Sequence, residues 1–168
     1  MPKIKLISTN RRVAVIVTLI IISFFLTTIF LPLLLVYLIP QSGIGYYLLE
    51  HLYYGYLSIP IMIYVVYSGI FCFNIKIDSY IIDIRSRRII SGIFKSPNYI
   101  DISHNMLSDF TFFNRPLSFN KTLMIKIETD TGKKITKRFN LTFLPKEEEK
   151  RISKTLEKII AKTADGRK

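Results

Sequence analysis

The first half of the chain contains two long apolar segments, residues 13–39 and 52–73, neither of which carries a charged side chain. An α-helix rises about 1.5 Å per residue, so each segment is long enough to cross the ~30 Å hydrocarbon core of a bilayer. In lipid the backbone must satisfy its own hydrogen bonds, which favours helices. The pattern predicts a two-helix transmembrane hairpin whose spans are joined by a short external loop over residues 40–51.

Basic residues indicate the orientation of this hairpin. Lys and Arg occur within the N-terminal segment 1–12 and again after Phe73, whereas the loop between the predicted spans contains none. Cytoplasmic segments that flank membrane spans are enriched in Lys and Arg. Both termini are therefore expected in the cytoplasm, with residues 1–12 as a basic cytoplasmic N-terminus, and the protein is expected to be multi-pass.

After Phe73 the pattern changes to short alternating segments, which are typical of strands separated by turns. These segments begin a cytoplasmic domain that we expect to cover residues 74–162. Its first predicted elements are a strand over residues 75–84, a polar turn from Arg85 to Arg88, and strands over 89–95, 99–103 and 109–113.

A β-hairpin is the clearest element of the second half. Residues 122–129 alternate between apolar and polar side chains, and residues 135–143 largely do the same. Between them lies Asp130-Thr131-Gly132, in which the glycine can adopt the positive φ that a tight turn requires. The pattern predicts two antiparallel strands that share one apolar face.

An amphipathic helix is predicted after Pro145, which suits a first helical turn because its missing N–H is not needed there. Acidic residues follow at the N-terminal end and lysines occur toward the C-terminal end, which favours the helix dipole. One apolar stripe would cover the sheet, and residues 163–168 are expected to be a frayed tail. The stripe consists of Ile152, Leu156, Ile159 and Ile160.

The order of these elements resembles that of the bacterial pleckstrin-homology-like (PH-like) domains. Two spans followed by such a domain are also similar to the STM-type family of small bacterial inner-membrane proteins, whose function is unassigned. The resemblance implies an α+β fold, with a bent antiparallel sheet or partial barrel closed by one C-terminal helix, and a location in the bacterial inner membrane. It is carried by the run from Ile75 to Phe94, the segments NYIDIS and LSDF, the hairpin TLMIKIETDTGKKITKRFNL, and the helix after Pro145.

Arg85, Arg87 and Arg88 are the first candidate binding residues. The resemblance implies that the first turn of the domain can hold phospholipid headgroups, and the forked donors of Arg match phosphate. The three residues are therefore a candidate contact for anionic lipid. The alternative is a solvated turn that only helps to fix the topology.

A second basic group lies in the predicted hairpin and consists of Lys133, Lys134, Lys137 and Arg138. It is a candidate contact for a partner or the membrane, and surface solvation is the alternative. The net charge of +12 is explained most simply by a cytoplasmic face near anionic lipid. Nucleic acid is not an expected partner, because no groove-reading motif is present.

The sequence contains no recognisable catalytic constellation. Walker, GxGxxG, HExxH and GxSxG motifs are absent, and the single cysteine, Cys72, cannot form an intrachain disulfide. Asp101, His104 and Asp109 are close in sequence, but a solvated loop is the more economical interpretation than a metal site. We therefore expect no enzyme activity, no metal and no cofactor.

The leading functional hypothesis is a membrane-tethered binding or scaffold protein that presents its PH-like domain at the inner face of the membrane. Its partners would be the lipid bilayer, anionic phospholipid headgroups, and another protein whose identity the sequence does not give. The alternative is a small membrane immunity or protective protein paired with a toxin.

Overall fold

The computed structural model describes residues 5–40, 43–51, 56, 58–90, 97–114, 116, 118–129 and 131–165. They form two compact units. One unit is the helical segment Val15–Gly69, and the other combines both of its flanks, Met1–Ala14 and Ile70–Lys168. The second unit, called here the sheet domain, is therefore interrupted in sequence by the first.

The helical unit begins with a long apolar helix. Helix α1 (Arg11–Leu38) contains Pro32, and within the described residues it is the one helix long and apolar enough to cross a membrane. This confirms the first apolar helix that the sequence predicts. Helix α2 (Gly43–Glu50) follows it, at the position predicted to be a loop. A Cβ atom on Gly45 would lie 2.9 Å from Val36 Cγ2, so glycine allows α2 to pack closely against α1.

The predicted second span over residues 52–73 is wrong at its C-terminal end. Helix α4 (Ser58–Ser68) stops before Gly69, which has φ +72°, and strand β2 begins at Phe71. Phe73 is only 1% exposed and belongs to the core of the sheet domain. A buried strand and a membrane helix are equally apolar, so hydropathy alone could not place this boundary. Residues 52–55 and 57 of the predicted span lie outside the described part.

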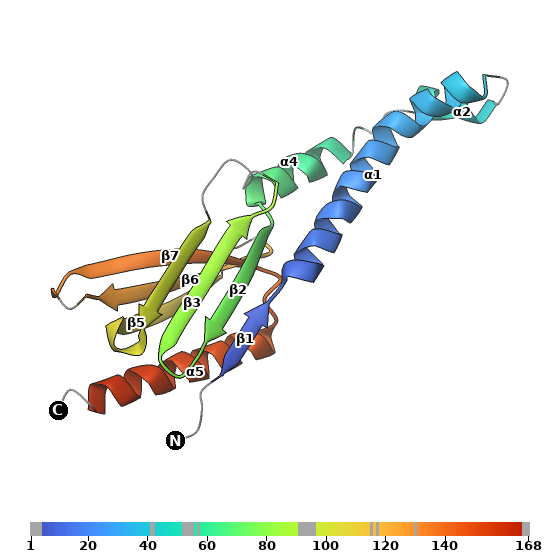
Figure 1. Ribbon diagram of the computed structural model, residues 1–168. Coiled ribbons are helices and arrows are strands. Elements are labelled where there is room, and N and C mark those ends of the chain that lie inside the picture. The colour runs from blue at the N-terminus through green and yellow to red at the C-terminus, as the bar shows by residue number, and fades with distance from the viewer. Residues whose placement is uncertain are drawn as a thin grey trace. The chain divides into compact units, whose positions relative to one another are not determined.

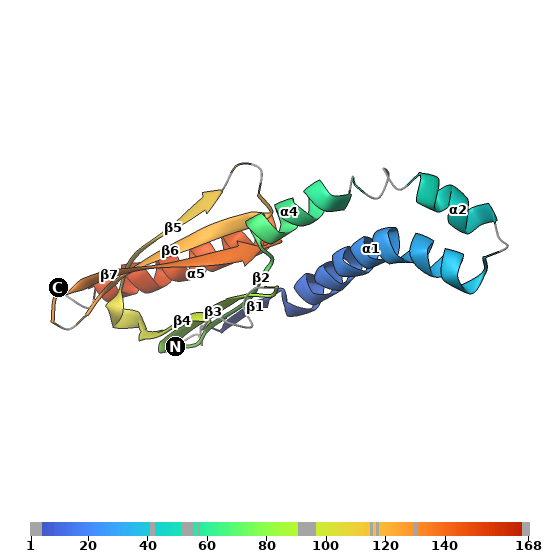
Figure 2. The same ribbon diagram turned by 90° about the horizontal axis from the view of Figure 1, so that it is seen from above.

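The sheet domain consists of two antiparallel sheets and one long helix (Figures 1 and 2). The first sheet has the strand order β1-β2-β3-β4 and the second has β5-β6-β7. A short 3-10 helix, η1 (His104–Met106), connects them, and helix α5 (Lys146–Asp165) packs against β1, β5 and η1. The strands are β1 (Leu6–Thr9), β2 (Phe71–Ile77), β3 (Ile81–Arg88), β4 (Asn98–Ser103), β5 (Leu107–Asn114), β6 (Asn120–Glu128) and β7 (Lys134–Thr142).

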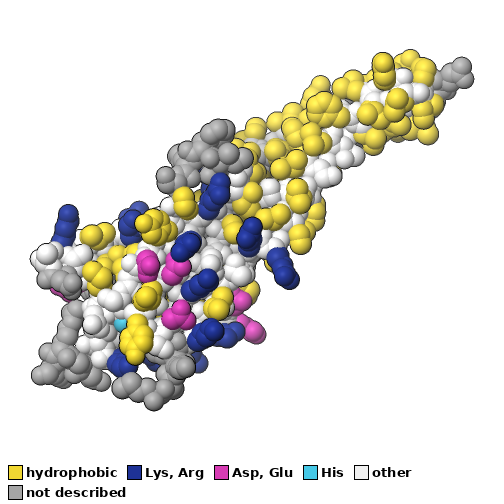
Figure 3. Space-filling model, in the orientation of Figure 1, with side chains coloured by type: hydrophobic (Ala, Val, Ile, Leu, Met, Phe, Trp, Pro, Cys, Tyr) yellow, Lys and Arg dark blue, Asp and Glu magenta, His cyan; other side chains and the backbone are white. Residues whose placement is uncertain are grey.

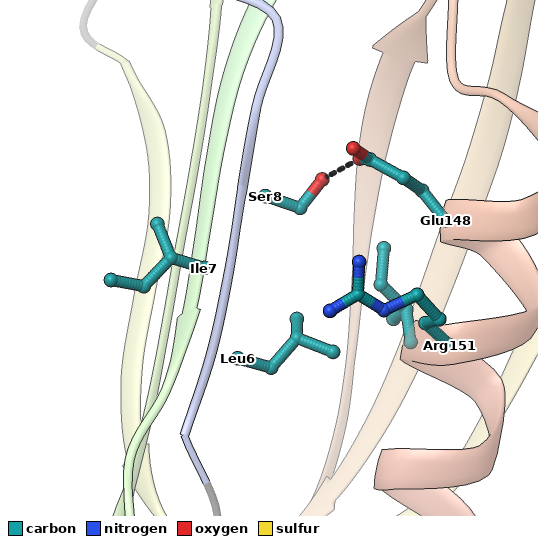
Figure 4. Close-up of a pocket in the computed structure, with 6 residues that line it drawn as sticks. Leu6, Ile7, Ser8, Glu148 and Arg151 are labelled. Carbon is teal, nitrogen blue, oxygen red and sulfur yellow. Dashed lines mark hydrogen bonds between the residues drawn. The ribbon is translucent and has the colours of Figure 1, made fainter.

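Strand β1 lies within residues 1–12, the predicted basic N-terminus, where the sequence pattern indicates no strand. It pairs antiparallel with β2, from Leu6 opposite Ile77 to Thr9 opposite Asn74. Leu6 and Ser8 are buried, while Ile7 between them is 57% exposed. The Ser8 hydroxyl donates a hydrogen bond to Glu148 of α5 across a small pocket (Figure 4). The sequence pattern did not reveal β1, because four residues are too few for a periodic signal and the partner strand β2 follows the entire helical unit in sequence.

The start of the first sheet also differs from the prediction. The strand predicted over residues 75–84 is divided by a turn at residues 78–80, where the Asp78 N–H donates to the Ile81 carbonyl at 3.0 Å. The predicted polar turn, Arg85 to Arg88, lies in β3. The inward-facing residue of this part of β3 is Ser86. The strand therefore continues through a position that has no apolar side chain. Ile89 and Ile90 form a bend rather than a strand, and residues 91–96 lie outside the described part.

The remaining elements confirm the sequence predictions, except that the last helix is longer than predicted. Strands β4 and β5 cover the two short predicted strands, and β6 and β7 form the predicted hairpin, with Gly132 at φ +77°. Helix α5 follows Pro145 and extends to Asp165, into the predicted tail. It buries Ile152, Leu156 and Ile159 against the sheets, so the α+β class is confirmed as two sheets closed by a C-terminal helix.

We predict that β1 stabilises the sheet domain. Replacing Leu6 by Ser should lower the free energy of unfolding by about 2 kcal/mol, because Leu6 is buried against the core. The Ile7→Ser change on the exposed side of the same strand is the control, with an expected effect within about 0.5 kcal/mol. Denaturant unfolding of the detergent-solubilised chain measures both. Equal losses in the two variants would contradict the position assigned to β1.

Candidate functional site

The chain leaves the sheet domain after β1 and returns to it at β2, and Asn10 lies at this point. Asn10 is 6% exposed. Its side-chain amide donates to the carbonyls of Phe71, at 2.9 Å, and Thr142, at 2.7 Å. Its Oδ1 accepts from the Phe73 N–H at 2.8 Å, and its carbonyl accepts the Ala14 N–H that opens helix α1. One side chain thus connects the end of β1, the start of β2 and the end of β7.

Thr142 completes this buried polar cluster, which we call the junction. Its side chain is fully buried, accepts from the Phe71 N–H at 2.8 Å and donates to Asn120 Oδ1. Thr9 adds a hydrogen bond from its hydroxyl to the Phe73 carbonyl at 3.0 Å. Polar groups buried without partners cost free energy, whereas mutually satisfied groups fix a single geometry. The junction therefore holds both chain connections of the helical unit in fixed positions on the sheet domain.

Side-chain hydrogen bonds also join the two sheets along strand β7. Its carbonyls at Arg138, Asn140 and Thr142 accept hydrogen bonds from Asn98, Ser86 and Asn10, respectively. These donors come from β4, from β3 and from the residue after β1. Every second carbonyl over this part of β7 is therefore bonded to the first sheet, so that polar side chains connect the sheets where no backbone ladder does.

The first candidate residues lie at the junction end of the first sheet, although the predicted turn is a strand. Arg88 is opposite Phe71 and Arg87 is opposite Cys72, at the start of β2. Arg85 is exposed, and its Nε contacts Asp83 Oδ1 at 3.0 Å, which raises the pKa of Arg85. All three belong to β3, with Arg85 and Arg87 on its outer face. Cys72 is half-buried in β2 rather than part of an apolar helix.

The second candidate group lies away from the first. Lys133 and Lys134 are at the β6–β7 turn, at the opposite end of β7 from Thr142. Lys137 is half-buried, and only Arg138 approaches the first sheet, through its carbonyl. A hollow of about 300 Å³ beside Lys134 is lined by Lys126 and Asp109, which form an ion pair. Lys126 Nζ lies 2.8 Å from Asp109 Oδ2, and this contact lowers the pKa of Asp109. Lys133 and Lys134 therefore lie away from the first candidate group, whereas the backbone of Arg138 lies beside the first sheet.

The structure separates the residues considered for a metal site. Asp101 lies opposite Asp83 in the first sheet, whereas Asp109 pairs with Lys126 in the second. Among the residues described, no cluster of His, Cys, Asp and Glu could hold a metal ion. His104 Nε2 is buried and has no hydrogen-bond partner there. Burial, followed by nearby Lys162, lowers the pKa of His104 below its ordinary value of 6.5.

Sequence reasoning missed Asn10 and a group of phenylalanines around the junction. Asn directly before an apolar helix is a common N-cap residue, and this signal was present in the N-terminal segment. Phe119 immediately precedes Asn120 and Phe143 immediately follows Thr142, and their ring centroids are 5.6 Å apart. Their grouping depends on the β6–β7 register, so sequence spacing alone could not reveal it.

The charged side chains and the apolar side chains are distributed differently over the chain. On the face in Figure 3, Lys, Arg, Asp and Glu gather on the sheet domain, and hydrophobic side chains cover the apolar helices. Comparison of the sequence with protein-family models and with curated proteins, and of the structure with solved structures, found no match. The functional argument therefore relies on the geometry of the chain itself.

We predict that Asn10→Ala destabilises the sheet domain by at least about 2 kcal/mol, because it leaves buried backbone groups of β2 and β7 without partners. The exposed Asn114 at the end of β5 supplies the control, Asn114→Ala, which should change stability by less than about 0.5 kcal/mol. Urea unfolding in detergent would measure both variants. A loss at position 10 no larger than at position 114 would refute the role of the junction.

Stability should also depend on the protonation of His104. Since the folded-state pKa lies below the unfolded value of 6.5, the unfolded chain binds the proton more readily. The contribution of neutral His104 to the stability of the folded chain is fully present above pH 6.5 and is lost as the pH falls toward the folded-state pKa. Thermal unfolding between about pH 7.5 and 5.5 should therefore show a smaller decrease for His104→Gln than for the wild type. Identical profiles would show that His104 does not contribute.

Proposed function

We propose that the protein is a membrane-tethered, non-enzymatic binding protein, whose apolar helices form a transmembrane hairpin carrying a PH-like domain at the inner face of a bacterial membrane. The observation that carries this proposal is the pairing of β1 with β2, the strands on either side of the apolar segment. If α1 crossed a bilayer once and the chain did not return, these strands would lie on opposite sides. Their hydrogen-bonded register therefore supports a chain that leaves and returns on one side of the bilayer.

The return passage in this proposal is residues 43–68, rather than the predicted 52–73. Helices α2 and α4 lie within it, and each is too short to cross a ~30 Å core by itself. The passage contains no Lys or Arg, and Glu50 is its one acidic residue. The close contact of Gly45 with Val36 supports a reversal of direction soon after α1 ends. Small residues commonly permit such close packing of membrane helices.

The charge distribution supports a cytoplasmic position for the sheet domain. Arg11 and Arg12 open α1, and β3 supplies further arginines beside the start of β2. These residues flank both ends of the apolar segment, and residues 13–75 contain no Lys or Arg. The positive-inside rule assigns such flanks to the cytoplasm, where anionic lipid also attracts them.

The strand order supports the PH-like part of the proposal. Four antiparallel strands, three further antiparallel strands and one C-terminal helix follow in that order. The transmembrane hairpin would then be an insertion between the first two strands of the PH-like domain, an arrangement that the sequence did not predict. Such a domain can bind through its strand edges, through basic surfaces or beside its helix. We propose lipid headgroups and another protein as the partners, with Arg85, Arg87 and Arg88 as candidate lipid contacts.

Topology reporters test the hairpin in the full-length chain. Green fluorescent protein fused before Met1 or after Lys168 should fluoresce in both cases, because both ends are expected in the cytoplasm. Alkaline phosphatase inserted after Gln41 should be active, because that position is expected outside. Opposite results for the two terminal fusions would indicate one crossing, and that outcome would refute the proposed function.

A further inference from the structure

The junction end of the sheet domain exposes aromatic side chains. Phe119 is 57% exposed and Phe113, at the end of β5, is 47% exposed. Phe119 adjoins Asn120, whose side chain accepts the Thr142 hydroxyl hydrogen bond at the junction. The rings of Phe119 and Phe143 are in contact, and the Phe143 N–H donates to the Phe119 carbonyl at 3.2 Å. These phenylalanines therefore lie at the same end of the domain as the connections to α1 and from α4.

The backbone of Phe143 is held in an uncommon conformation. Its φ is +56°, in the left-handed region that bulky residues rarely adopt. The hydrogen bonds on either side, from Thr142 to Asn120 and from Phe143 to Phe119, fix this turn between β7 and α5. The turn places the Phe143 ring beside the exposed Phe119 ring instead of continuing the strand.

Basic side chains accompany the aromatic group. Arg11 and Arg12 are exposed at the start of α1, and Arg87 is exposed on β3 opposite Cys72. Lys146 and Glu147 are exposed at the start of α5, where Glu148 and Glu149 are half-buried and bonded to Ser8 and Lys121. The net charge of these exposed residues is positive, which favours contact with an anionic surface. Aromatic rings favour the headgroup layer of a bilayer.

The chain connections leave little space between this end and lipid. Only Asn10 separates β1 from α1, and only Gly69 and Ile70 separate α4 from β2. Helix α1 has 28 residues. At ~1.5 Å per residue such a helix is about 42 Å long, which matches the ~40–45 Å bilayer thickness that includes the headgroups. A helix of this length would begin at the headgroup surface, one residue after β1 ends.

We propose that the junction end is a membrane-docking surface, in which the rings of Phe113, Phe119 and Phe143 enter the headgroup layer of the bilayer that α1 crosses. At the rim of this docking surface, anionic lipid is contacted by Arg11, Arg12 and Arg87. This inference rests on the proposed function, because it requires α1 to span that bilayer. The docked domain is held against the lipid in one orientation, so its basic residues at the β6–β7 turn face away from the membrane.

Tryptophan fluorescence tests this surface, because the natural chain contains no Trp. The full-length Phe119→Trp variant is placed in nanodiscs of phosphatidylethanolamine and phosphatidylglycerol, with or without bromine on the acyl chains. The control is Tyr80→Trp, since Tyr80 is 80% exposed in the β2–β3 turn, at the other end of the first sheet. Brominated lipid should quench the Phe119→Trp variant at least about twofold more than the control, and aqueous acrylamide should show the reverse order. Equal quenching of the two variants would overturn the docking surface.

Two further measurements separate the parts of the proposal. Alkaline carbonate treatment of membranes tests the anchor alone. Release of the chain would overturn the proposed function and the docking surface with it, whereas retention without quenching of the Phe119→Trp variant would overturn only the docking surface.

Replacing phosphatidylglycerol by phosphatidylcholine should reduce the quenching of the Phe119→Trp variant. Unchanged quenching would overturn the arginine contact and leave the aromatic contact supported.

Discussion

The structure depends on the pairing of two strands that the sequence places on either side of a long apolar segment. Strand β1 supplies the edge of the first sheet, and β2, its neighbour in space, begins only after α4. A connection of this length costs chain entropy when its ends are brought together. Burial of Leu6, the backbone ladder and the hydrogen bonds of Asn10 offset that cost within the sheet domain. The apolar segment is thus constrained at both ends by the fold of a different unit.

Strand β7 extends this constraint to the second sheet. An exposed strand edge offers unpaired carbonyls to other chains, and proteins commonly cover such edges. Here the carbonyls of Arg138, Asn140 and Thr142 accept side-chain donors from the first sheet. Each such bond contributes only about 0.5–1.5 kcal/mol net, but an unsatisfied buried carbonyl would cost more. The donors therefore specify how the sheets meet, in addition to stabilising the contact.

Elements with strong local patterns could be predicted from the sequence. The β6–β7 hairpin has a glycine turn and alternating residues, and α5 has an apolar stripe that the structure buries. Strand β3 was misread because its inward position after Ile84 is Ser86, whose hydroxyl is satisfied by the Asn140 carbonyl at 2.7 Å. A buried serine beside arginines looks like a turn until its partner is known. The same dependence on a distant partner concealed β1 and Asn10.

The boundary between helix α4 and the core of the sheet domain explains the remaining error. Phe71 to Phe73 continue the hydrophobicity of the helix before them, yet Phe73 is buried among the isoleucines of the sheets. Hydropathy measures removal from water and does not distinguish lipid from a protein interior. The positive φ of Gly69 and the Asn10 bonds to β2 place the boundary, because they end the helix and start the strand. The junction therefore decides both where the apolar segment stops and at which residue the sheet domain resumes.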